Sequence, residues 1–181
     1  MAELDTSDAV LRARRGDRQA MEALVRRFLR PAYVVALSVV RVPVEAEDVA
    51  QEAVAMAMQQ LETCRDPGRF AAWLMSNVRN RALNRLAASK VRQRYADGAS
   101  HDEAAASDTE RVVLREQLLA ALEVLTPQQR EVVLLHDLES WTHPEIASAL
   151  GLSEVNSRQV LSVARRALRA KLVELEEVRD E

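Results

Sequence analysis

The side chains of this sequence that could do chemistry are mostly cations and amides rather than catalytic groups or metal ligands. Its three histidines (His101, His136 and His143) lie in different segments, and Cys64 is the single cysteine. Metal sites and nucleophilic centres need several such groups at characteristic spacings, and no such spacing or phosphate-binding loop occurs here. We therefore expect no catalytic residue, no metal and no cofactor, and we predict that the chain is not an enzyme.

Cations and amides gather in a segment that begins near residue 69. Five polar residues there include no acid and are suited to phosphate contact: Arg79, Asn80, Arg81, Asn84 and Arg85. A solvated helix face has the same pattern. Phe70, Trp73 and Leu74 precede them, and such residues at helical spacing are more often core than a surface on which bases stack. We expect Trp73 to belong to the core.

An acidic group lies upstream of this segment. Gln51 and Glu52 follow Asp48 by three and four residues, so the three side chains share one helix face. By pattern alone, this face is a solvated polar stripe.

The segment from Thr142 to Leu168 predicts a helix-turn-helix. Thr142 and Glu145 fit a capping box, and Pro144 stands in the first helical turn, where its missing N–H does no harm. Gly151 can adopt the left-handed conformation that ends this helix, and Ser153 can cap the next one. The first turns of that next helix would face a DNA major groove. An ordinary helical hairpin in a bundle is the alternative.

The sequence predicts that all the elements that position these groups are helices. In the first part of the chain, apolar periodicity and turn signals predict helices over residues 21–30, 32–41 (separated or kinked by Pro31), from about 45 to 62, and 69–94. In the second part they predict helices over residues 114–125, 128–138, 143–150 and 154 to about 176. Residues 97–109 show no periodicity and no large apolar side chain. The prediction is an all-α protein of two small helical domains, residues 1–95 and 112–181, joined by a flexible acidic linker over residues 96–111.

Charge supports this division. Residues 1–94 carry a net charge of +5 and residues 95–125 a net charge of −5, although the whole chain has only −3. Basic charge is therefore concentrated where a DNA face could lie. The N-terminus contains no apolar run of the signal-peptide type, and the longest apolar stretch, residues 32–40, is too short to span a bilayer. We expect a cytoplasmic protein without membrane contact.

The two helical blocks, in this order, resemble the two conserved domains of the sigma-70 family of RNA polymerase sigma factors, specifically its short extracytoplasmic-function group. The resemblance covers about residues 10–172. In the first block it rests on Glu47-Asp48-Val49-Ala50-Gln51-Glu52, Phe70-x-x-Trp73-Leu74 and Arg79-Asn80-x-Ala82-Leu83-Asn84-Arg85-Leu86. In the second it rests on Leu125-Thr126-Pro127-Gln128-Gln129-Arg130-Glu131-Val132-Val133-Leu134, Glu145-Ile146-Ala147, Gly151-Leu152-Ser153-Glu154 and Ala164-Arg165-Arg166-Ala167-Leu168.

The resemblance implies a role for each block in promoter-specific transcription initiation. Asp48, Gln51 and Glu52 would bind the clamp of the largest subunit of core RNA polymerase. A second set would melt and read the −10 promoter element: Arg69, Trp73, Asn77, Arg79, Asn80, Arg81, Asn84 and Arg85. A third set would read the −35 element as duplex: Ser153, Asn156, Ser157, Arg158, Gln159, Ser162, Arg165 and Arg166. The second domain would also bind the flap of the second-largest subunit, and an anti-sigma factor would cover both domains. The resemblance implies a monomer and identifies neither the promoter, the inducing signal nor the anti-sigma partner.

The final helix departs from the family pattern. Family members commonly carry basic residues where this chain has Val160 and Val163, and an apolar residue where it has Ser157. Leu161, Ala164, Leu168 and Leu172 form the predicted inward stripe, so Val160 and Val163 should point largely outward and weaken phosphate contact. These valines motivate the alternative of a sigma-like decoy or adaptor, which binds a regulator without directing initiation. A two-domain helix-turn-helix repressor explains the second block but gives the acidic face around Asp48 no purpose.

Overall fold

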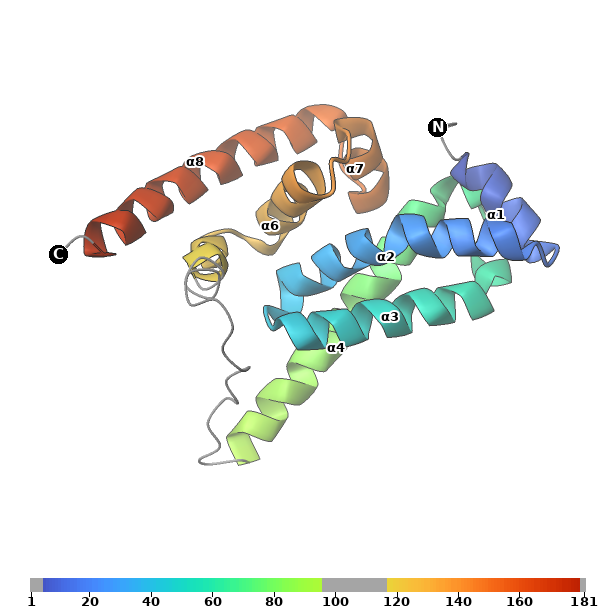
Figure 1. The fold of residues 1–181 in the computed structure, drawn as a ribbon, viewed down its shortest axis with the longest axis horizontal. Helices are drawn as coiled ribbons and strands as arrows, with labels where there is room; N and C mark the ends of the chain where they lie inside the picture. The colour runs from blue at the N-terminus through green and yellow to red at the C-terminus, as the bar shows by residue number, and fades with distance from the viewer. Residues whose placement is uncertain (1–4, 96–116, 180–181) are drawn as a thin grey trace.

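The computed structural model describes residues 5–95 and 117–179, and all the regular structure within these residues is helical (Figure 1). We call residues 5–95 the first half and residues 117–179 the second half. The first half contains α1 (Thr6–Arg14), α2 (Arg18–Val40), α3 (Pro43–Gln59), the short 3-10 turns η1 (Leu61–Thr63) and η2 (Pro67–Arg69), and α4 (Phe70–Tyr95). This confirms the predicted all-α class. The predicted linker, residues 96–111, lies outside the described residues.

The second half begins with a helix over residues 117–123 and continues with α6 (Pro127–Val133), the π-helical turn η3 (Leu134–Leu138), α7 (His143–Leu150) and α8 (Glu154–Arg179). The bounds of α7 match the prediction. The helix predicted over residues 128–138 is present, but its last turn is widened to π geometry. In Figure 1, α8 extends away from the rest of the molecule toward the C-terminus.

The predicted separation of two helices at Pro31 is wrong, because this proline was given too much weight. Pro31 lies inside α2, which runs without a break from Arg18 to Val40. Proline removes one hydrogen bond from a helix interior, but burial of the α2 face around Pro31, which is itself buried, outweighs this cost. The helix predicted from about residue 45 begins slightly earlier, with Pro43 as the first residue of α3, a position where proline is well tolerated.

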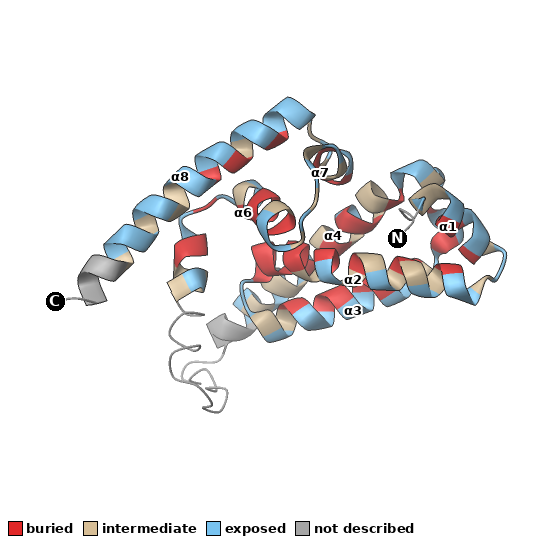
Figure 2. Cartoon of the chain, turned by 45° about the horizontal axis from the view of Figure 1, so that its top comes forward, coloured by how far each residue is buried: buried red, intermediate tan, exposed pale blue. Residues whose placement is uncertain are grey.

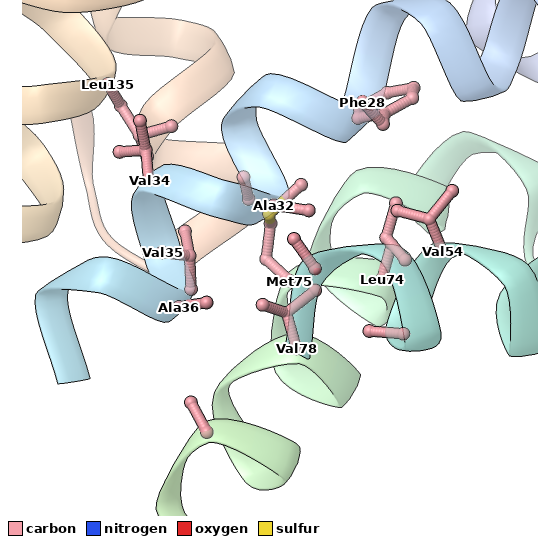
Figure 3. Close-up of a cluster of buried hydrophobic side chains, with 14 of the residues drawn as sticks. Phe28, Ala32, Val34, Val35, Ala36, Val54, Leu74, Met75, Val78 and Leu135 are labelled. Atoms are coloured by element: carbon pink, nitrogen blue, oxygen red, sulfur yellow. The ribbon is translucent and has the colours of Figure 1, made fainter. Parts of the chain in front are cut away.

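The first half is built around the middle of α2. Phe28 meets Phe70 edge to face, with ring centroids 5.2 Å apart, and Leu74, Met75 and Val78 of α4 are fully buried in the same cluster (Figure 3). Each fully buried side chain of this size contributes about 1.5–3 kcal/mol relative to exposure. This packing fixes α3 and α4 against α2 and so determines which of their faces remain exposed.

The apolar core continues from the first half into the second. Leu135, Ile146, Leu161 and Ala164 belong to the same contiguous cluster of buried residues as the α2 and α4 side chains. Figure 3 shows Leu135 beside Val34 of α2. Figure 2 shows that the buried residues of α8 lie on one side of that helix, while most of its surface is exposed. Within the described residues, no helix is both long enough and apolar enough to cross a bilayer.

Candidate nucleic-acid interface

The acidic face of α3 is exposed, and α4 partly neutralises it. Asp48 and Glu52 retain 53% and 61% of their side-chain exposure, and Gln51 is also exposed. The guanidinium of Arg85 donates to Asp48 Oδ2 and that of Arg81 to Glu52 Oε2, each at 3.1 Å. Because all three side chains of the predicted clamp face lie on the surface, a partner protein can reach them.

One side of α4 carries an aromatic residue and three amides in a row. Trp73, Asn77, Asn80 and Asn84 follow at steps of four, three and four residues, so they share a helix face. Trp73 packs against Phe70 with ring centroids 5.8 Å apart but is only partly buried, so it is a rim residue rather than the core residue we predicted. Among the described residues the three amides have no hydrogen-bond partner, so their donors and acceptors are available for a ligand.

Three arginines in the middle of α4 point in two directions. Arg81 and Arg85 point toward α3, as described above, whereas Arg79 points toward the second half of the chain. Arg79 Nε and Nη2 donate to Glu131 Oε1 and Oε2 at 2.9 and 2.8 Å, a bidentate pair. The bond to Glu131 raises the pKa of Arg79 above its usual value. Arg69, which precedes α4, is exposed.

Arg130, the neighbour of Glu131 in sequence, also bonds to the first half of the chain. Arg130 is 3% exposed, and its guanidinium donates to the backbone oxygens of Leu122, Leu125 and Ser38. The hydroxyl of Ser38 lies 3.4 Å from Glu131 Oε1. The residues Arg130 and Glu131 therefore connect α6 to the end of α2 and to α4. Sequence reasoning gave neither residue a role of its own, because both were seen only as part of a family motif.

The helix-turn-helix has the local devices that the sequence predicts. The Thr142 side chain accepts from the Glu145 N–H, and Glu145 Oε2 accepts from the Thr142 N–H at 2.8 Å, which completes the capping box. Gly151 has φ +69° and ends α7, and Ser153 Oγ accepts from the Asn156 N–H at 3.1 Å at the start of α8. These caps fix the angle at which α8 leaves α7.

The residues predicted to read the −35 element are mostly exposed along α8, with one correction. The exposed residues of the set are Ser153, Asn156, Arg158, Gln159, Ser162, Arg165 and Arg166. Ser157 is fully buried, and its hydroxyl lies 2.9 Å from His143 Nδ1, so it cannot contact DNA. It lies four residues before Leu161 and extends the inward stripe of α8.

The predicted inward stripe of α8 also needs two corrections. Leu161 and Ala164 are buried, but Leu172 is 41% exposed because α8 has by then passed beyond the body of the second half. Val160 packs against the core, whereas Val163 is 49% exposed as expected. Only one of the two valines therefore occupies an outward position. Arg165 Nε donates to Asp137 Oδ2 at 3.1 Å, so part of the positive charge of α8 is already paired.

Two histidines meet beneath α8, which sequence reasoning missed. The rings of His136 and His143 lie 4.9 Å apart between centroids, and Asp137 lies beside His136. Burial lowers the pKa of His143, helped by the positive charges of His136 and of nearby arginines. Their seven-residue separation across a turn gave no helical signal. Among the described residues no group of three or more candidate ligands could hold a metal ion.

Comparison with known protein families gives two matches along the chain. A model of sigma-70 region 2 matches residues 24–102, and a model of sigma-70 region 4 matches residues 115–168. The first contains most of α2 and all of α3 and α4, and the second contains α6, α7 and the first part of α8.

Several curated proteins are similar over most of the chain. The probable RNA polymerase sigma factor RfaY of Xanthomonas campestris is 32% identical over 94% of this chain, which spans only 46% of that protein. RNA polymerase sigma factor CarQ of Myxococcus xanthus is 33% identical over 91% of this chain and 96% of its own length. The ECF RNA polymerase sigma factor SigL of Mycobacterium tuberculosis is 33% identical over 72% of this chain and 76% of its own length.

Two solved structures share the fold. CnrH, in complex with the cytosolic domain of CnrY, superposes with a TM-score of 0.66 at 24% identity and covers 93% of this chain and 97% of its own. RpoE of Bartonella quintana, in complex with the anti-sigma factor NepR, gives a TM-score of 0.58 at 20% identity and covers 83% of this chain and 95% of its own.

Proposed function

The chain belongs to the extracytoplasmic-function group of the sigma-70 family, and on that premise we propose that it binds core RNA polymerase and directs initiation at specific promoters. Two faces on adjacent helices carry the proposal: an exposed acidic face on α3 and a partly exposed aromatic-amide row on α4. The proposal assigns no catalytic step to this chain and places it with the polymerase in the cytoplasm.

In this proposal the α3 face binds the polymerase clamp. Asp48 and Glu52 offer carboxylates and Gln51 an amide on one exposed surface, which suits a basic partner surface. Their pairs with Arg85 and Arg81 are solvent-exposed and contribute only about 0.2–1 kcal/mol each, so a partner can replace them at little cost. The arginines released in this way would become available to DNA phosphates, which would couple the two binding events.

The −10 element would be read by α4. Trp73 can stack on an unpaired base, which is worth about 1–3 kcal/mol per base, and the amides of Asn77, Asn80 and Asn84 can bond to base edges. Arg69 would contribute phosphate contacts from the turn that precedes the helix, and Arg79, Arg81 and Arg85 would do so from α4.

The −35 element would be read by α8, from which Asn156, Gln159 and Ser162 can reach base edges. Ser153, Arg158, Arg165 and Arg166 would hold the DNA backbone. The exposed Val163 adds no charge, so we expect a weaker salt dependence than a cation at that position would give. The remaining surface of the second half would contact the polymerase flap. Because one of the structural relatives is bound to an anti-sigma factor, we expect such a partner for this chain as well.

The test is transcription from a random promoter library by core polymerase with and without the chain. We expect enrichment of promoters with two conserved elements. Enrichment of a −10 element alone would refute the role of α8, and no enrichment with intact polymerase binding would favour the decoy.

A matched pair of double variants tests the clamp face. Asp48→Ala with Gln51→Ala should weaken polymerase binding by about ten-fold or more without unfolding the chain, since both side chains are exposed. Gln19→Ala with Glu22→Ala on α2 removes the same kinds of group at the same spacing from another exposed face and should leave binding unchanged. Equal affinities for both variants in a titration would refute the assignment.

A further inference from the structure

A cavity of about 500 Å³ lies where the end of α2 and the middle of α4 meet the second half of the chain. α6 and the last residue of α7 complete its lining. Sites for small organic molecules typically have volumes of about 300–1,000 Å³ and combine an apolar lining with a few polar groups. The volume of this cavity therefore suits a small molecule.

Positive charge dominates the lining of the cavity. Its charged residues are four cations and one carboxylate: Arg41, Arg79, Lys90, Arg130 and Glu131. Both oxygens of Glu131 already accept bonds from Arg79. Among the described residues, no carboxylate lies within ion-pair distance of Arg41, Lys90 or Arg130. The cavity therefore brings together three cations without a paired anion.

Arg130 is the most deeply buried of these cations. It is 3% exposed, and its guanidinium donates to three backbone carbonyls rather than to a carboxylate. Burial lowers the pKa of Arg130, and the positive charge of Arg41 lowers it further, with a smaller opposing effect from Glu123. Buried charges in proteins are normally paired, because removing an ion from water is costly. An anion in the cavity would supply the missing opposite charge.

Arg41 adopts a backbone conformation that arginine normally avoids. It caps the C-terminus of α2 with φ +62°, in the left-handed region that glycine and asparagine favour at such positions. Its exposed side chain borders the cavity, where it repels Arg130. Strained backbone of this kind is often found at binding sites. A bound anion would offset both the strain and the repulsion, which the folded chain alone does not.

Apolar side chains form most of the remaining lining. They are Val39 of α2, Leu83 and Leu86 of α4, Pro127 of α6 and Leu150 of α7. Leu83 is 50% exposed, although it is a large apolar residue. An inorganic anion would leave this apolar surface in contact with water, whereas an anion with an apolar body would cover it.

We propose that this cavity binds a small amphipathic anion. Its oxyanion head group, a carboxylate or a phosphate, lies near Arg41, Lys90 and Arg130, and its apolar body packs against Leu83 and Leu86. Such a site allows a metabolite to act on the chain directly, without a partner protein. The proposal does not rest on promoter recognition, because it concerns a ligand of the isolated chain.

The first experiment is calorimetric titration of the full-length chain with octanoate, which joins a carboxylate to an apolar chain. Octanol, with the same chain and no charge, and inorganic phosphate, with charge and no apolar chain, are titrated in parallel. We expect one octanoate per chain, bound at least ten-fold more tightly than either of the others. Equal binding of octanol would exclude the cations, and equal binding of phosphate would exclude the apolar wall. Either result, or no saturable binding of octanoate, would overturn the proposal.

A matched pair of variants tests the location of the site. Leu83→Asp places a carboxylate at the cavity wall and should weaken octanoate binding by about ten-fold or more, because like charges repel. Leu138→Asp makes the same change at a residue outside the cavity that is equally exposed, at 52%, and should leave the affinity unchanged. Equal affinities of the two variants would refute the assignment of the ligand to this cavity.

Arg41→Gly separates a binding role from a structural one. It should weaken octanoate binding by about ten-fold through loss of one charged contact. The urea midpoint should not fall, because glycine accepts the left-handed φ and the repulsion of Arg130 is removed. Arg26→Ala removes the same charge from an exposed position of α2 and should change neither quantity. An unchanged affinity for octanoate in Arg41→Gly, or a lowered midpoint, would contradict the role given to Arg41.

Discussion

The Arg79–Glu131 pair should respond very differently to removal of one partner or the other. Glu131 is 5% exposed and Arg79 is 32% exposed. If Arg79 is truncated, the carboxylate is left buried, and its remaining hydrogen-bond partner among the described residues is the Ser38 hydroxyl, at 3.4 Å. Truncating one partner of a buried pair typically costs about 3–5 kcal/mol because the other charge is left uncompensated. We place Arg79→Ala near the lower end, at about 3 kcal/mol, since Arg79 itself is partly exposed.

The opposite change should be milder. Glu131→Gln keeps the size of the side chain and one acceptor for Arg79, and the guanidinium retains access to water. Loss of the charged bonds should cost about 1–2 kcal/mol. The double variant Arg79→Ala with Glu131→Gln removes the uncompensated charge and should be more stable than Arg79→Ala alone, so the two effects are not additive.

Urea unfolding followed by circular dichroism at 222 nm measures these differences. With a slope of about 2 kcal/mol per M, Arg79→Ala should lower the midpoint by about 1.5 M and Glu131→Gln by about half as much. Arg166→Ala, on the exposed face of α8, is the control and should leave the midpoint within about 0.25 M. If Glu131→Gln costs as much as Arg79→Ala, or if the double variant equals the sum of the two, the argument from unequal burial is wrong.

Three further predictions concern the helix-turn-helix. Ser157→Arg should destabilise the chain by about 2 kcal/mol or more because it forces a cation into a buried site. Ser162→Arg, on the exposed side of α8, should leave the unfolding midpoint unchanged and steepen the salt dependence of DNA binding. Equal stabilities of the two variants would contradict the inward placement of Ser157. Gly151→Ala should lower the free energy of unfolding in urea by about 1–2 kcal/mol, because Gly151 has a left-handed φ of +69° and a Cβ there would meet no neighbour. Gly151→Asn should lower it by less. An unchanged stability of Gly151→Ala would rule out that backbone conformation. The pKa of His143 is lowered in the folded chain, so the unfolded chain binds more protons as pH falls. The stability that neutral His143 contributes is therefore present above about pH 6.5 and is lost as pH falls through the folded pKa. The urea midpoint should therefore drop between pH 7.5 and pH 5.5, and by less in His143→Gln; the same drop in both proteins would assign it to other groups.

Much of the helix-turn-helix was predictable because its signals are local. The capping box at Thr142 and Glu145, the left-handed Gly151 and the Ser153 cap each depend on a few adjacent residues, and the structure confirms all three. Ser157 was predictable in principle. It lies four residues before Leu161 on the apolar stripe, and the family's apolar residue at this position was the signal that pointed inward.

The relation between the halves could not be predicted in the same way. The bonds from Arg79 to Glu131 and from Arg30 to Glu139 join residues 52 and 109 positions apart, and no periodicity in the sequence encodes such a distance. Pro31 failed as a signal for the converse reason. A local rule predicted a break, and burial of α2 by the elements packed around it overrode that rule. The interpretation of the chain as separate helical units missed the packing of one unit against the other for this reason.

The arginines of α4 carry a consequence for the evolution of such chains. Arg79, Arg81 and Arg85 lie within two turns of one helix, yet their carboxylate partners belong to α6 and α3. A change at any of the three would alter an internal pair and, in the proposed function, a promoter contact as well. Among related sequences, substitutions at these positions should therefore covary with those at Glu131, Glu52 and Asp48, and a lineage that acquires a new −10 preference should carry a paired change in one of these carboxylates.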